Sequence, residues 1–179
     1  MVLRPFTSAV AASAVLLAVV VTTRAGGDSR RLIPSAFFIS KNQNKNQVHY
    51  AIDVDGACSP LGAAPVRAYW RMLEESRERT EPLLPRERPA YDIAWQRVVR
   101  SSNGEPVIEL ALRGLPSRPL SVRTRASSAG CVPETWMTVD HSTARLTQIH
   151  VKFGLFGVDS ITLLGYAPER GLVREELKE

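Results

Sequence analysis

Short segments that alternate apolar and polar side chains, separated by turn signals, constrain the fold of this chain more than any other feature. In residues 47–55, every second side chain from Val48 to Val54 is large and apolar. This period of two is typical of a half-buried β-strand. Asn103-Gly104, between two such segments, is a strong β-hairpin signal. Because similar segments recur about every 8–12 residues, we predict an all-β domain.

We predict about nine strands of this kind in one domain over residues 35–179. The predicted segments are 36–40, 47–55, 66–72, 91–100, 107–113, 120–125, 135–139, 146–153 and 158–166, with a last short one at 172–175. Short connections favour pairing in chain order, so the expected topology is a single antiparallel meander that forms a partly closed barrel. A two-sheet β-sandwich fits the same pattern. Residues 73–90 are irregular, with a short helix expected over 73–79 before three prolines break the chain.

The first 25 residues differ from the rest and have the pattern of a signal peptide. Arg4 precedes an uncharged, mostly apolar run over residues 9–21, and small residues, Thr23 and Ala25, occupy the two positions that a signal peptidase reads. We therefore expect a signal helix that is cleaved after Ala25, a flexible lead-in over residues 26–34, and no stable membrane span after cleavage. An uncleaved anchor is the alternative, although the run is shorter than the roughly 20 apolar residues of a spanning helix.

Export has consequences for the cysteines and for the charge. Cys58 and Cys131 would meet an oxidising compartment, periplasmic or extracellular, where a pair of thiols tends to form a disulfide. Two separate buried thiols are the alternative.

Loss of Arg4 and Arg24 lowers the formal net charge from +5 to +3, and the chain has no long basic run. We therefore expect no nucleic acid among the partners.

Several blocks of the mature chain resemble a family of bacterial exported proteins. They are FFISK at 37–41, NKNQVHY at 44–50, YWRMLE at 69–74 and TEPL at 80–83. The family is known as a domain of unknown function. The resemblance covers nearly all of the mature chain and implies a bacterial envelope protein with one domain. It supplies no catalytic residues.

The sequence contains no nucleophile elbow, phosphate-binding loop, zinc-protease helix or Cys-x-x-Cys motif. We therefore expect no catalytic residue, cofactor or metal ion. The first functional expectation is a non-catalytic domain that binds an envelope ligand or a protein partner. The predicted ligand-binding residues lie around the Asn-rich turn and on two alternating segments: Lys41, Asn46, His49, Tyr69 and Arg71.

An envelope hydrolase is the alternative function. His49 would then act as general base, oriented by a carboxylate from another strand, because a base must lie within hydrogen-bonding reach of the proton it takes. Asp53 shares a strand face with His49, but at about 3.3 Å per residue the two lie roughly 13 Å apart. A concave pocket around a buried histidine would favour the enzyme, whereas a flat face or an apolar cavity would favour the binding domain.

Overall fold

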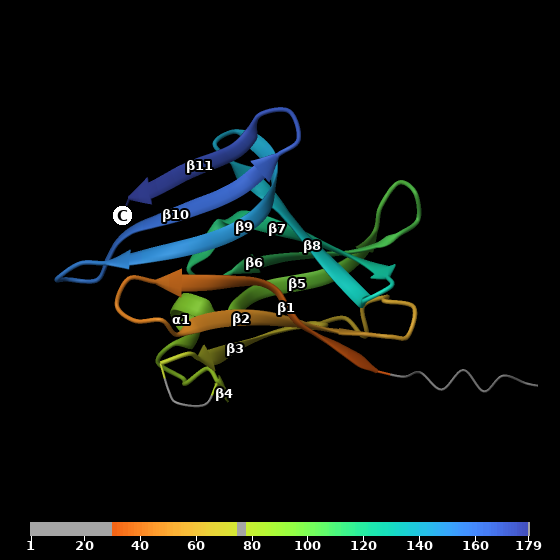
Figure 1. The fold of residues 1–179 in the computed structure, drawn as a ribbon, viewed down its shortest axis with the longest axis horizontal. Helices are drawn as coiled ribbons and strands as arrows, with labels where there is room; N and C mark the ends of the chain where they lie inside the picture. The colour runs from red at the N-terminus through yellow and green to blue at the C-terminus, as the bar shows by residue number, and fades with distance from the viewer. Residues whose placement is uncertain (1–29, 75–77, 179) are drawn as a thin grey trace, which may run out of the picture.

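Strands make up most of the computed structural model, which describes residues 30–74 and 78–178 (Figure 1). The predicted all-β class is confirmed. The strands are β1 (Arg31–Lys41), β2 (Gln47–Val54), β3 (Val66–Met72), β4 (Arg79–Pro82), β5 (Ile93–Arg100), β6 (Pro106–Leu112), β7 (Leu115–Ser127), β8 (Gly130–Val139), β9 (Ser142–Phe153), β10 (Val158–Ala167) and β11 (Gly171–Lys178). A single helical turn, α1 (Arg88–Tyr91), precedes β5. The expected signal helix lies outside the described residues.

Several strands depart from the predicted boundaries; β7 and β8, for example, are longer than the predicted segments 120–125 and 135–139. β1 begins at Arg31, so the end of the predicted lead-in belongs to a strand. β4 occupies part of the stretch that was expected to be helical or irregular, and it pairs with the second half of β3. Most of its residues are exposed. It therefore lacks the apolar alternation from which the other strands could be predicted.

Within the described residues, eleven strands form one mixed sheet. The order is β4-β3-β2-β1-β9-β8-β7-β6-β5, and β10 and β11 continue from the opposite edge of β9. The predicted meander is wrong at two junctions. β5 forms no backbone ladder with β3 or β4 and ends the strand order opposite β4. β1 pairs with β9 in parallel over Ile39–Lys41. The parallel pairing follows from the length of β9. β8 pairs only with Ser142–Arg145, so backbone groups in the second half of β9 need another partner.

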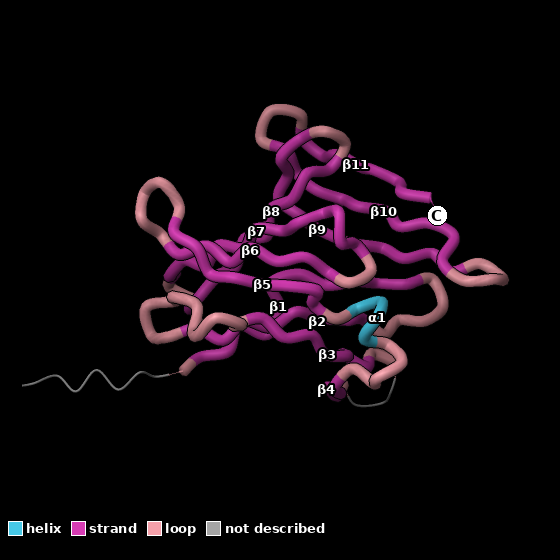
Figure 2. Tube along the Cα trace, turned by 180° about the vertical axis from the view of Figure 1, so that it is seen from behind, coloured by secondary structure: helices cyan, strands magenta, loops and turns pink. Residues whose placement is uncertain are grey.

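The sheet curls around its core without closing, which also corrects the prediction of a partly closed barrel (Figure 2). β5 approaches β3 at Val66, where the Gln96 side chain donates to the Val66 carbonyl and accepts from the Val66 N–H, both at 2.9 Å. A side chain thus takes the place of a backbone ladder between these two strands. The alternative of two separate sheets is not formed either, because each strand in the order from β4 at one end to β5 at the other pairs with the next.

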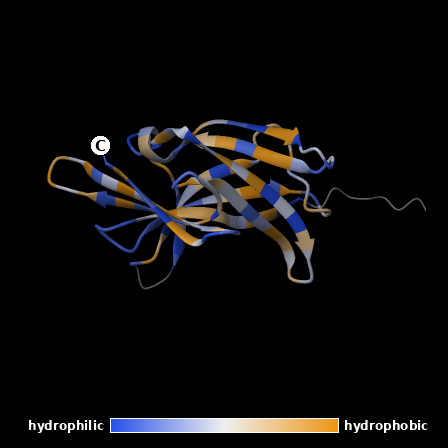
Figure 3. Ribbon diagram, turned by 90° about the horizontal axis from the view of Figure 1, so that it is seen from above, coloured by the Kyte–Doolittle hydropathy of each residue, from blue (hydrophilic) through white to orange (hydrophobic). Residues whose placement is uncertain are grey.

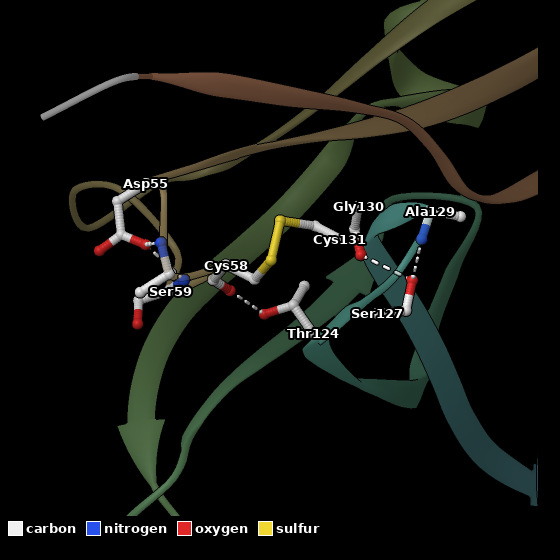
Figure 4. The surroundings of a disulfide bond; sticks show 9 residues. Asp55, Cys58, Ser59, Thr124, Ser127, Ala129, Gly130 and Cys131 are labelled. Atoms are coloured by element: carbon white, nitrogen blue, oxygen red, sulfur yellow. Dashed lines mark hydrogen bonds between the residues drawn. A yellow bond between two sulfur atoms is a disulfide. The ribbon is translucent and has the colours of Figure 1, made fainter.

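A disulfide joins Cys58, in the connection between β2 and β3, to Cys131 at the start of β8 (Figure 4). This confirms the predicted pair. The Asp55 carboxylate accepts two backbone N–H groups of the same connection, both at 2.8 Å. The Thr124 hydroxyl on β7 donates to the Cys58 carbonyl at 2.6 Å. The bond spans 73 residues of sequence, and closing a loop of this size stabilises a fold by about 4 kcal/mol in the chain-entropy model.

Candidate functional site

His49 lies on the outer face of β2, and both nitrogens of its ring have hydrogen-bond partners. Nδ1 is 2.8 Å from the Ser35 hydroxyl on β1, and Nε2 is 2.9 Å from the Gln47 side-chain oxygen. An amide oxygen can only accept, so Nε2 carries the proton and Nδ1 accepts from Ser35. The group that orients the ring is therefore an amide of the same strand, and not the expected carboxylate from another strand.

Aromatic side chains from the two neighbouring strands cover the His49 ring. The ring centroid of Phe38 on β1 lies 5.3 Å from that of His49, and the centroid of Tyr69 on β3 lies at 5.8 Å. His49 is only 3% exposed. Burial, and after it the positive charge of Arg71, lowers the pKa of His49 to about 4. The ring is therefore neutral at neutral pH.

Tyr69 and Arg71 share the outer face with His49, and both already have partners. The Tyr69 hydroxyl donates to the Pro34 carbonyl at 2.7 Å. The Arg71 guanidinium forms a two-pronged ion pair with Glu78, in which Nη2 lies 2.9 Å from Oε2. The structure thus brings three of the five predicted ligand-binding residues together. Their polar groups are bonded within the protein.

Lys41 and Asn46 lie apart from that group. Lys41 ends β1 on the inner face, where its Nζ is 4.4 Å from the centroid of the Trp70 ring, and burial lowers the pKa of Lys41. The buried Asn46 side-chain oxygen accepts two backbone N–H groups just beyond β3, at 2.9 and 3.3 Å. Asn46 therefore ties the β1–β2 turn to β3. The five predicted residues are divided between two sheet faces and a turn.

The other two histidines do not join His49 in one cluster. His150 on β9 has its Nδ1 2.9 Å from the Ser40 hydroxyl, which also accepts from the Gln148 amide at 2.8 Å. His141 lies in the turn between β8 and β9. Among residues 30–74 and 78–178, no three His, Cys, Asp or Glu side chains gather as metal ligands. In the same residues we find no helix with the length and hydropathy of a membrane span.

An apolar cavity of about 310 Å³ opens on the inner side of the sheet, between α1 and the β9–β10 hairpin. These two elements lie at the same end of the molecule (Figure 1). The lining residues are Ile39, Pro89, Ala90, Tyr91, Leu112, Gly114, Leu115, Ile149, Val151, Phe153, Val158 and Ile161. Apolar side chains dominate this lining, and the volume falls in the lower range of small-molecule sites.

The helical turn α1, which forms one wall of the cavity, is held in place by contacts within the protein. The buried Tyr50 hydroxyl donates to the Tyr91 carbonyl at 2.6 Å. The Tyr91 ring packs edge-on against Trp70, with the centroids 5.5 Å apart. Gly114 permits the close approach of α1, because a Cβ atom there would lie 2.5 Å from the Ala90 carbonyl oxygen. These contacts fix the position of the α1 wall of the cavity.

The β9–β10 hairpin borders the cavity and ends in an exposed apolar turn. Phe153 and Val158, which pair across the base of this turn, both line the cavity. Between them, Leu155 is 96% exposed and Phe156 is 101% exposed. A backbone hydrogen bond of 2.8 Å between the two flanking glycines closes the turn. Figure 3 shows this hydrophobic turn projecting at the far left of the molecule.

Neither the cavity nor the apolar turn was predicted. A strand was predicted over residues 146–153, but alternation does not reveal which apolar side chains remain uncovered. One local signal was available. The segment 154–157 reads Gly-Leu-Phe-Gly, which places two large apolar residues in a turn, where small and polar residues are usual.

Residues 37–174 match a family model described as a domain of unknown function (DUF4833). The chain belongs to the DUF4833 family. This confirms the expected membership in a domain of unknown function. No curated protein and no solved structure matches the chain. The DUF4833 match extends from β1 into β11, so it includes His49, Tyr69 and Arg71 and all residues that line the cavity, whereas Ser35 lies before it.

Proposed function

We propose that this DUF4833 domain is an exported, non-catalytic domain that binds an apolar small molecule in the cavity between α1 and the β9–β10 hairpin. The cavity with its apolar lining carries the proposal. Moving apolar surface of a ligand out of water is favourable by about 25 cal/mol per Å². A cavity with such a lining offers water few hydrogen-bond partners. An apolar ligand is thus the occupant that this lining favours.

Export is the second part of the proposal. Two observations support it: the signal-peptide pattern of residues 1–25 and the Cys58–Cys131 disulfide. Disulfides persist in oxidising compartments and are rare in a reducing cytosol. We place the domain in the periplasm or outside the cell, where its partner is an apolar ligand of the envelope.

Titration with the fluorescent apolar probe N-phenyl-1-naphthylamine tests the binding function. We expect saturable binding with one probe per chain. Val158→Trp, at the mouth of the cavity, should abolish binding by blocking entry. Leu172→Trp, on β11 away from the cavity, is the matched control and should bind as the wild type does. Circular dichroism melts establish that both variants fold. Unsaturable binding, or full binding by folded Val158→Trp, would refute the cavity as the site.

One observation favours a second candidate function, an envelope hydrolase. The Ser35 hydroxyl, the His49 ring and the Gln47 amide form a chain in the order of nucleophile, base and orienting group. Two features oppose it. The low exposure of His49 leaves little room for a substrate, and a pKa of about 4 makes His49 a weak base at neutral pH. Labelling by a fluorophosphonate that is lost in Ser35→Ala would support the hydrolase, and failure to label folded wild type would eliminate it.

A further inference from the structure

The exposed turn 154–157 is a feature that ligand binding in the cavity does not explain. Leu155 and Phe156 stand side by side and are almost completely open to solvent. A single exposed apolar residue such as Leu172 is ordinary on a protein surface. Two large neighbours at the end of a projecting hairpin are a liability in water, and they indicate a surface that is covered during function.

The base of the hairpin is fixed, so the turn is held outward. The Asn42 side chain bonds to both backbone groups of Phe153, accepting from its N–H at 2.8 Å and donating to its carbonyl at 3.2 Å. An ion pair between Lys152 and Asp159 crosses the hairpin behind the turn, with Nζ 2.5 Å from Oδ2. The apolar turn and the charged pair behind it are therefore separate layers along one projection.

The shape of this projection favours a lipid bilayer over a protein partner. A stable protein interface buries about 800 Å² on each side, whereas two side chains on a convex turn offer only a small contact. A bilayer requires no complementary shape. Apolar side chains enter the acyl region, and polar groups behind them remain at the level of the headgroups. Lys152 and Asp159 would lie at that depth, where phospholipids carry charges of both signs.

We propose that the turn 154–157 is a membrane-docking tip, and that the cavity takes a single acyl chain exchanged with the bilayer that the tip contacts. Phe153 and Val158 connect the two features, because each belongs to both the base of the tip and the cavity wall. Docking would bring the mouth of the cavity to the acyl region, so the chain would move without crossing water. The acyl-chain clause rests on the proposed function, whereas membrane docking stands without it.

Flotation of the mature chain with phosphatidylcholine vesicles, with and without phosphatidylglycerol, tests the tip. We expect the wild type to partition onto both. The double variant Leu155→Ser/Phe156→Ser should lose about tenfold in partitioning for each apolar side chain removed. Leu172→Ser is the control, because it removes another exposed leucine away from the tip, and it should partition as the wild type does. The double variant should still bind N-phenyl-1-naphthylamine, so a failure of the tip and a failure of the cavity are distinguishable.

The depth to which the turn 154–157 enters the bilayer is a direct readout of membrane docking. Vesicles with brominated acyl chains should quench the added fluorescence of Phe156→Trp and leave that of Leu172→Trp unchanged. Wild type that does not float, or a double variant that floats equally well, would overturn docking. So would loss of self-association in the double variant, because a second copy of the chain would then cover the tip. Palmitate should displace N-phenyl-1-naphthylamine, and a bound probe that palmitate cannot displace would overturn the acyl-chain clause alone.

Discussion

The two ends of the curled sheet are held in opposite ways. At the disulfide end, formed by the β2–β3 connection and the start of β8, Cys58–Cys131 cross-links the chain and Asp55 closes a loop with two hydrogen bonds (Figure 4). At the cavity end, formed by α1 and the β9–β10 hairpin, apolar side chains surround an open volume and the turn projects outward. The contrast indicates that one end maintains the fold, which leaves the other end free to remain incompletely packed, as the proposed binding function requires.

Removal of the disulfide should give the largest effect and should act on one end only. We expect Cys58→Ser/Cys131→Ser to lower the free energy of unfolding by about 4 kcal/mol, because the unfolded chain regains the freedom of a long loop. Chemical denaturation of both proteins measures this loss. Probe binding to the folded variant should be unchanged. A variant that keeps its stability, or one that is folded but no longer binds the probe, would contradict the separation of the two ends.

Truncating one isoleucine in the packed core and one isoleucine at the cavity should show how packing differs between these two places. Ile108 on β6 is fully buried outside the cavity, whereas Ile161 on β10 lines the cavity. Ile108→Ala should cost about 3 kcal/mol, since a new void forms in a packed core. Ile161→Ala should cost roughly half as much, because its side chain already borders an open volume. Equal losses in urea denaturation would mean that the cavity end is packed as tightly as the core.

A pH dependence should arise at His49, on the outer face of β2. Its pKa is about 6.5 in the unfolded chain and about 4 in the folded protein. The unfolded state therefore binds the proton first as the pH falls. The stabilisation is complete above about pH 6.5, is lost progressively down to about pH 4, and levels off below it, with a total of at most about 3 kcal/mol. The free energy of unfolding of His49→Gln should lack this dependence on pH. If the difference in this free energy between wild type and His49→Gln stays constant between about pH 4 and about pH 6.5, the lowered pKa of His49 is refuted.

Local features of the fold could be predicted from the sequence, and features that combine distant segments could not. Alternation from Val48 to Val54 identified β2, and Asn103-Gly104 identified the β5–β6 hairpin. The parallel pairing of β1 with β9 has no local signal, because it depends on how much of β9 remains unpaired by β8. β4 escaped detection because its pairing is between backbones and most of its side chains are exposed.

The candidate sites show the same division. The alternating segments that carry His49, Tyr69 and Arg71 pair as neighbours, so these side chains lie on one face. Alternation could not show that Ser35 and Gln47 already satisfy the His49 ring. The cavity involves residues from β1, α1, β6, β7, β9 and β10, so its existence depends on how the side chains of six elements fill space.

The smallest effect is expected at Arg71, and it separates the predicted ligand-binding residues from the cavity. The Arg71–Glu78 pair lies at the surface, where such pairs contribute about 0.2–1 kcal/mol. Arg71→Ala should therefore change the free energy of unfolding by less than about 1 kcal/mol. Because the cavity lies on the opposite face of the sheet, probe affinity should remain within about twofold, well below the tenfold that 1.4 kcal/mol represents. Arg71→Lys is the control for charge alone. A loss of probe binding in Arg71→Ala that Arg71→Lys restores would show that the ligand occupies the outer face around His49, Tyr69 and Arg71, and that the cavity is not the site.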